Sequence, residues 1–208
     1  MNKRLVWNFE VNLDKPFAAE QLSARAHDLI RWEARYFWSE DQPITLYHLN
    51  STILSFVNVQ IKERYDSYYL LPQMHLNIKK RREELFYKPL LARKDHCFGF
   101  GKKMSLKSLP AEQALPGCSS LDVGALVNLL KLQGTIVNVD KTALIYKFSC
   151  TPTIKLELSR LIINKQIYFS ASIEGRSYTL VSKLSQLLLK EQFSCDYVTF
   201  LNQLNYDQ

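Results

Sequence analysis

The sequence has few cysteines, no long apolar run and none of the common catalytic motifs. Its four cysteines lie far apart, without the paired spacing of a zinc site or the density of a disulfide framework. No stretch reaches the roughly 18 apolar residues that span a bilayer, and the first ten residues lack the apolar core of a signal peptide. Glycine-rich phosphate loops, dinucleotide fingerprints, HExxH and serine-elbow motifs are also missing. We therefore expect a cytoplasmic protein without a membrane partner, outside the common nucleotide-binding folds.

Length and charge bound the class of protein further. The chain has 208 residues, of which 47% are hydrophobic and 23% are charged, and this is enough apolar surface for one folded core. We expect a single domain over residues 1–208. The formal net charge of +7 favours anionic partners. A small phosphorylated anion is the preferred partner, ahead of nucleic acid, and the sequence leaves the oligomeric state open.

Alternation of period two is the strongest pattern, and it indicates strands with one apolar and one polar face. It is clearest at Ile154–Ser159 and Ile167–Glu174, which a turn at Asn164 and Lys165 joins into an antiparallel hairpin. Further strands are expected at 5–13, 66–72, 76–81, 85–91 and 135–147. The sequence therefore predicts an α+β fold rich in antiparallel strands.

Four segments have the three- and four-residue spacing of helices. They are 16–35, 120–132 with a cap at Ser119 or Ser120, 177–190, and a segment that begins at Cys195. Residues 38–64 fit neither period for long, and residues 98–117 have the glycine, lysine and proline content of a surface loop. We expect the helices to pack against the sheet.

Some strand faces carry charge instead of neutral polar groups. Asn77, Lys79 and Arg81 share one face because side chains two residues apart point the same way, and Lys88 can join them from the next strand. Charged residues on the other polar faces are Glu10, Lys155, Glu157 and Glu174. Cations gathered in this way can hold phosphates, while carboxylates can hold a divalent metal ion.

The same residues allow plainer interpretations. One face of an antiparallel sheet commonly meets water, and the run Lys79–Arg82 would also suit a solvated basic edge that discourages strand addition. Generic nucleic-acid binding is another alternative, because Tyr68, Tyr69 and Tyr87 lie close in sequence to these cations. The histidines are scattered, and none is assigned to the site.

From Asp66 onward the chain resembles the CYTH superfamily of triphosphate tunnel metalloenzymes, which includes inorganic and thiamine triphosphatases and class IV adenylate cyclases. The family pattern is an aspartate, paired tyrosines and a proline, then a strand of alternating basic residues, then a strand that ends on lysine. The matching residues here are Asp66, Tyr68, Tyr69 and Pro72, then Lys79 and Arg81, then Lys88.

The resemblance extends along nearly the whole chain. Glu10 resembles part of the family's acidic first strand, and Glu157 and Glu174 resemble the acids of its late hairpin. The tail around Tyr197 resembles the motif near the family's end. The resemblance implies an eight-stranded antiparallel β-barrel, a tunnel with polar side chains inside and helices packed outside. It implies phosphate binding by Lys79, Arg81, Lys88 and Lys155, binding of Mg²⁺ or Mn²⁺ by Glu10, Glu157 and Glu174, and support from Asp66, Tyr69 and Lys141.

The acidic half of this pattern is incomplete. The first strand has Asn12 beside Glu10, so one of the family's two glutamates is missing. In the late hairpin Ser172 stands where a glutamate is expected, and Ser159 can replace an aspartate. The cationic residues of the family pattern are therefore more completely present than the acidic residues that would hold a metal ion.

Two functions follow from the sequence. The first, which the sequence favours, is a metal-dependent phosphohydrolase acting on tripolyphosphate, thiamine triphosphate or a nucleoside triphosphate. The second is a tunnel domain with weak or no turnover, which binds a nucleotide, a polyphosphate or an RNA 5′ end. The missing acids support the second function.

Overall fold

The computed structural model describes residues 2–14, 23, 27–49, 59–190 and 192–206. The main sheet contains β3 (Arg31–Ser39), β5 (Gln60–Leu71), β6 (Met74–Arg81), β7 (Glu84–Lys88), β8 (Leu90–Lys94), β9 (Cys97–Phe100), β10 (Met104–Ser105), β13 (Thr135–Phe148), β14 (Ile154–Ile163) and β15 (Gln166–Gly175). A small sheet contains β1 (Asn2–Val6), β2 (Phe9–Asn12) and β4 (Ile44–Leu46), and a ribbon contains β11 (Ala114–Leu115) and β12 (Cys118–Asp122). The helices are α1 (Val123–Gln133), α2 (Tyr178–Leu189), α3 (Tyr197–Tyr206) and the short 3-10 helix η3 (Leu106–Ser108).

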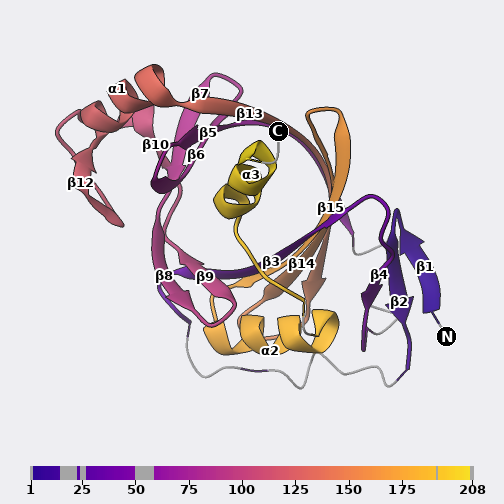
Figure 1. The fold of residues 1–208 in the computed structure, drawn as a ribbon. Coiled ribbons are helices and arrows are strands. Elements are labelled where there is room, and N and C mark those ends of the chain that lie inside the picture. The colour runs from indigo at the N-terminus through magenta and orange to yellow at the C-terminus, as the bar shows by residue number, and fades with distance from the viewer. Residues whose placement is uncertain (1, 15–22, 24–26, 50–58, 191, 207–208) are drawn as a thin grey trace.

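The main sheet has ten antiparallel strands in the order β10-β7-β6-β5-β13-β14-β15-β3-β9-β8, and it curls into a barrel-like shell (Figure 1). Strands β7 and β8 pair near opposite ends of this order, with β6 and β9, yet only Pro89 separates them in the chain. Proline donates no hydrogen bond to a ladder, so the strand breaks there. The fold is α+β with a barrel-like sheet of ten strands instead of the eight expected.

Two helices cover the convex face of the curled sheet. The apolar side of α2 packs on Trp32, Ala34 and Tyr36 of β3 and on the outward residues of the β14–β15 hairpin. Leu126 and Leu130 of α1 pack on the outward side of β5, β6 and β7. Both contacts follow from the period of two, because every second residue of these strands is apolar and points outward.

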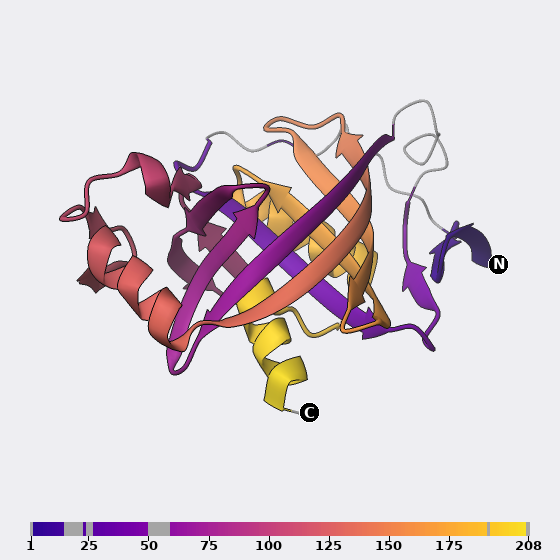
Figure 2. The ribbon, with the colours of Figure 1, turned by 90° about the horizontal axis from the view of Figure 1, so that it is seen from above.

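Helix α3 lies on the concave face, inside the ring of strands (Figures 1 and 2). Its apolar side meets inward residues of β5, β13 and β14, among them Val137, Val139, Leu161 and Ile163. Helices were expected only outside the barrel, and α3 corrects this expectation. It can lie inside because the inward side chains change from charged to apolar along several strands, for example from Glu157 to Leu161 on β14.

The helix expected at 16–35 is wrong at its C-terminal end, where Arg31–Ser39 form β3. Trp32, Ala34 and Tyr36 are buried on one face while Glu33 and Arg35 point to the other, which is the alternation of a strand. Residues 15–22 and 24–26, where this helix would begin, lie outside the described residues, as do 50–58 of the unassigned segment.

Other elements differ from expectation in detail. The strand expected at 5–13 is a hairpin of β1 and β2, because the chain turns at Trp7 with a φ of 49°. Asp122, instead of a serine, caps α1 by accepting a hydrogen bond from the Ala125 amide. The loop expected at 98–117 contains β10, η3 and β11. The β14–β15 hairpin and α2, with Ser177 as its cap, are confirmed.

Among the described residues no helix is long and apolar enough to cross a membrane.

Candidate anion-binding site

The charged half of the concave face encloses a cavity of about 500 Å³, which we call the central pocket. The cationic side chains of its lining are Arg31, Arg35, Lys62, Arg64, Lys79, Arg81, Lys88, Lys102, Lys103, Lys141, Lys155 and Arg176, and the acidic ones are Glu33, Asp66, Glu157 and Glu174. Twelve basic against four acidic residues leave a formal excess of eight positive charges, whereas the formal charge of the whole chain is +7. The basic character of the protein is therefore concentrated in the central pocket.

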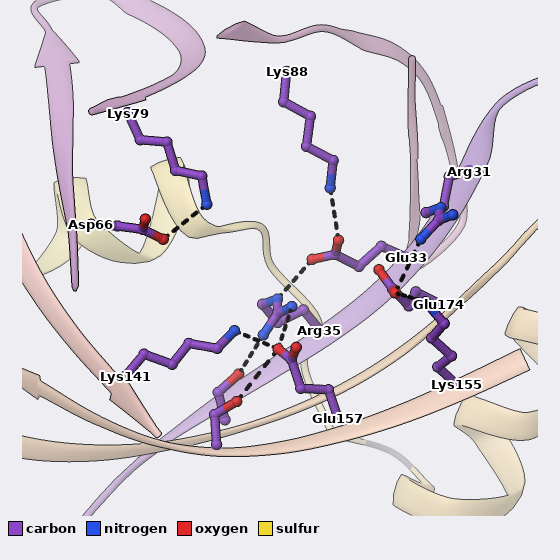
Figure 3. Close-up of polar contacts among 12 residues, drawn as sticks. Arg31, Glu33, Arg35, Asp66, Lys79, Lys88, Lys141, Lys155, Glu157 and Glu174 are labelled. Atoms are coloured by element: carbon purple, nitrogen blue, oxygen red, sulfur yellow. Dashed lines mark hydrogen bonds and ion pairs between the residues drawn. The ribbon is translucent and has the colours of Figure 1, made fainter. Parts of the chain in front are cut away.

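Arg35 lies at the floor of the pocket in a buried network (Figure 3). Its Nε donates to Oε1 of Glu33 at 2.7 Å, and its Nη2 lies 3.3 Å from Oε1 of Glu157. Lys141 bonds the same Glu157 oxygen, and Lys88 Nζ lies 3.0 Å from Oε2 of Glu33. Two carboxylates are thus shared by three cations.

The ionisation of this network is set by opposing effects. Burial would raise the pKa of Glu33 and of Glu157, but the cations beside them, Lys88 and Arg35 for the first and Lys141 and Arg35 for the second, hold both below the usual 4.5. Burial would likewise lower the pKa of Arg35, and Glu33 raises it above its ordinary value. Glu33, Glu157 and Arg35 are therefore charged at neutral pH, in a place where desolvation makes charge costly.

A second group surrounds Asp66 on β5. Its carboxylate accepts from Nε and Nη2 of Arg81 at 2.6 and 2.7 Å, and from Nζ of Lys79 at 3.0 Å. Burial lowers the pKa of Lys79 to about 7, with Asp66 acting against this shift and the nearby Arg81 and Lys141 adding to it. Lys79 therefore changes its charge close to neutral pH.

A third group lies nearer the solvent. Glu174 Oε1 is 3.2 Å from Arg31 Nη1 and 3.6 Å from Lys155 Nζ. Beyond it, five lining cations have no carboxylate partner within the described part of the chain: Lys62, Arg64, Lys102, Lys103 and Arg176. Seven other cations share four carboxylates, so many lysine and arginine donors remain for the oxygens of an anion.

Most of the residues singled out in the sequence meet in this pocket. They are Asp66, Lys79, Arg81, Lys88, Lys141, Lys155, Glu157 and Glu174. Ser172 is buried on the wall, and its hydroxyl has no hydrogen-bond partner among the described residues.

Two predicted residues lie elsewhere. Glu10 is on β2, which within the described residues pairs only with β1 and β4, and Asn2 Nδ2 lies 3.4 Å from its carboxylate. The small sheet stands beside the main sheet, so Glu10 cannot share a site with Glu157 (Figure 1). Tyr69 points outward and packs near α1, while its neighbour Tyr68 lines the pocket, because adjacent residues of a strand face opposite sides.

Sequence reasoning missed Arg31, Glu33 and Arg35, which β3 contributes to the wall. The signal was present as three charged residues at a spacing of two, separated by Trp32 and Ala34. It was hidden because the helical pattern from Pro16 was extended across it.

The carboxylates, as they are arranged, do not fit a resident Mg²⁺ or Mn²⁺. Divalent ions of this kind need several oxygen ligands, and both oxygens of Glu33 and of Asp66 are paired with lysine or arginine. Within the described ranges no three His, Cys, Asp or Glu side chains lie close enough together to hold a metal ion. The carboxylate oxygens bind lysine and arginine side chains of the protein itself, and these cations can bind an anionic ligand.

A larger hollow of about 1030 Å³ lies outside the curled sheet, beside α2 and β4. Apart from tyrosines, its ionisable lining residues are His96 and Lys190. It lacks the gathering of charges that distinguishes the central pocket, so the chemistry of the site belongs to the concave face.

No family model and no curated protein matches this chain. Among solved structures, the PH1819 protein of Pyrococcus horikoshii OT3 aligns over 85% of this chain and 99% of its own, with 15% identity and a TM-score of 0.38. A protein of Bacillus halodurans described as a "putative adenylate cyclase" aligns over 79% of this chain and 92% of its own, with 12% identity and a TM-score of 0.39.

Proposed function

We propose that this chain is a CYTH-like tunnel domain whose central pocket binds a phosphorylated anion directly through lysine and arginine side chains. The observation that carries the proposal is the formal excess of eight positive charges in the lining of one pocket. Burying charge is costly, and perturbed pKa values cluster at functional sites. A structural role alone would have been met more cheaply by apolar residues of similar volume.

The architecture supports a tunnel domain. We count β7 and β8 as one strand that is interrupted at Pro89. The main sheet without β10 then has eight strands, in the order β7/β8, β6, β5, β13, β14, β15, β3 and β9. This number corresponds to the eight-stranded barrel that the resemblance implies. The alternation then places the charged faces toward the interior, where they need not be solvated sheet surface.

Phosphate groups suit this pocket better than carboxylates or sulfates of low charge. Arginine binds phosphate oxygens with paired donors, and lysine acts as a point charge. A chain of two or three phosphates presents several negative charges within a few ångströms, which matches lining cations contributed by β3, β5, β6, β7, β13 and β14. We therefore place nucleoside triphosphates, thiamine triphosphate and tripolyphosphate in the ligand class.

Metal-dependent hydrolysis of a triphosphate is the second candidate. One observation favours it: Glu33 and Glu174 are directly opposite each other in the β3–β15 register, so two carboxylates share one part of the wall. Like charges in such a position are unfavourable unless other groups compensate them. Here Arg31, Arg35, Lys88 and Lys155 provide that compensation, so the hydrolase candidate requires that a metal ion displace these cations from Glu33 and Glu174.

Calorimetric titration with tripolyphosphate in the presence of a chelator tests the proposal. We expect binding by the native protein and a loss of about ten-fold or more in affinity for Lys88→Ala, since one charge-assisted hydrogen bond contributes about 1.5–3 kcal/mol. Lys131→Ala is the matched control, because Lys131 is an exposed residue of α1 outside the pocket. Absence of binding by the native protein would exclude the proposed function.

Phosphate release from tripolyphosphate, thiamine triphosphate and ATP separates the two candidates. Release that requires Mg²⁺ or Mn²⁺ and is lost in Glu174→Ala would establish the hydrolase. Chelator-resistant binding without release would establish a binding domain.

A further inference from the structure

Helix α3 contributes its first residue, Tyr197, to the central pocket. Tyr197 is only 7% exposed, and its buried hydroxyl has no hydrogen-bond partner among the described residues. Buried hydroxyls in folded proteins are nearly always bonded, because an unmet polar group loses its hydration without compensation. The hydroxyl of Tyr197 is therefore an unused donor in a pocket rich in cations, where it can bond an anion.

The ring of Tyr197 is held firmly in place. It stacks on the ring of Tyr68 with 5.1 Å between centroids, and it meets Phe37 edge-on at 5.2 Å. The guanidinium carbon of Arg35 lies 4.8 Å from its centroid, and Nζ of Lys141 lies 5.7 Å away. An anion drawn to these two cations comes to Tyr197 as well, and it can accept a hydrogen bond from the hydroxyl.

The residues just before α3 form hydrogen bonds with the backbone of Arg35. The amide of Arg35 donates to Oγ of Ser194 at 3.1 Å, and its carbonyl accepts from the Cys195 amide at 2.9 Å. Strand β9 pairs with β3 only over Arg31–Glu33, so the C-terminal segment occupies the edge of β3 that β9 leaves open. Arg35 thus lines the pocket with its side chain and binds the residues just before α3 with its backbone.

We propose that Tyr197 is a ligand-binding residue of the central pocket, that its hydroxyl donates a hydrogen bond to the bound phosphorylated anion, and that the anion thereby stabilises α3 in its docked position. This inference rests on the proposed function and adds a neutral donor, supplied by a helix, to the lysine and arginine side chains. Coupling of this kind is reciprocal, so a docked α3 also strengthens anion binding.

The test compares Tyr197→Phe with the native protein in tripolyphosphate titrations with chelator present. We expect the affinity of Tyr197→Phe to fall about ten- to a hundred-fold, as for a hydrogen bond to a charged group. The melting temperature without ligand should stay the same or rise, because the substitution removes a buried hydroxyl that bonds nothing. A structural role would instead lower the melting temperature and leave the affinity unchanged.

Tyr87→Phe is the matched control, because Tyr87 is equally buried but its hydroxyl donates to the Pro116 carbonyl at 2.8 Å, outside the pocket. It should lower stability and leave affinity unchanged. Equal affinity of Tyr197→Phe and native protein would overturn the inference while the proposed function stands. Failure of the native protein to bind would defeat the proposed function first, so the two failures are distinguishable.

Hydrogen exchange of the α3 amides provides a second readout. Tripolyphosphate should slow exchange in α3 of the native protein, and slow it much less in Tyr197→Phe. Unchanged exchange in α3 on binding by the native protein would contradict the coupling.

Discussion

Lys79 makes the pocket sensitive to pH near neutrality. Its pKa is about 7, so it is mostly charged at pH 6 and mostly neutral at pH 8, whereas Arg35 and Arg81, whose pKa is raised, stay charged. We expect anion affinity to fall over this range relative to Lys79→Arg, which keeps its charge throughout. Parallel pH profiles in tripolyphosphate titrations of the two proteins would contradict this prediction.

The lowered pKa of Lys79 also has a defined effect on folding. The unfolded chain holds this proton up to the ordinary value of 10.5, and the folded chain releases it near 7. Between these values the unfolded state binds more protons, so this residue makes the protein more stable as the pH rises through the window. A bound phosphate would oppose the loss of the proton, because its negative charge favours the charged amine.

The sequence correctly predicted the position of a pocket residue only where it also predicted the strand that carries that residue. Lys79, Arg81 and Lys88 were predicted to converge because their strands were placed correctly, and the structure brings them into one cavity. Glu33 and Arg35 were missed because a helix was assigned to their strand. A period of two over only five residues competes poorly with a longer helical pattern next to it.

At the scale of elements, α3 is the part that the sequence described least well. Its apolar spacing predicted a helix, and the helix exists, but spacing alone does not say which face of a sheet it meets. The answer lay in the strands, whose inward faces become apolar at one end, as at Val137 and Val139 of β13. Those residues need a partner inside the curl, and α3 is that partner.

We predict that Phe200→Ala lowers the free energy of unfolding by about 3–5 kcal/mol, the usual cost of truncating a buried phenylalanine. Phe200 of α3 is 8% exposed and stacks on Phe37 with 3.9 Å between ring centroids. Phe193→Ala is the control, because Phe193 is 82% exposed and should cost little. Denaturant unfolding at pH 7 measures both changes, and equal effects would show that α3 is not docked as described.

For the molecule as a whole, the class of fold followed from alternation, but the closure of the sheet did not. Strand periods show which residues share a face and say nothing about which distant strands pair. The pairing of β3 with β15, more than a hundred residues later in the chain, depends on the packing of both strands against α2. Alternation therefore predicted antiparallel strands, and the resemblance implied a barrel of eight strands, whereas the ten-stranded order and the location of β3 came from the structure.

The measurement that tests the central claim most directly is a crystal structure of the protein soaked with tripolyphosphate. We predict phosphate density in the central pocket within hydrogen-bonding distance of Lys79, Lys88 and Arg35, with Tyr197 beside it. Density only on exposed lysines outside the pocket, or an empty pocket at saturating tripolyphosphate, would contradict the claim that these charges are arranged for a phosphorylated anion.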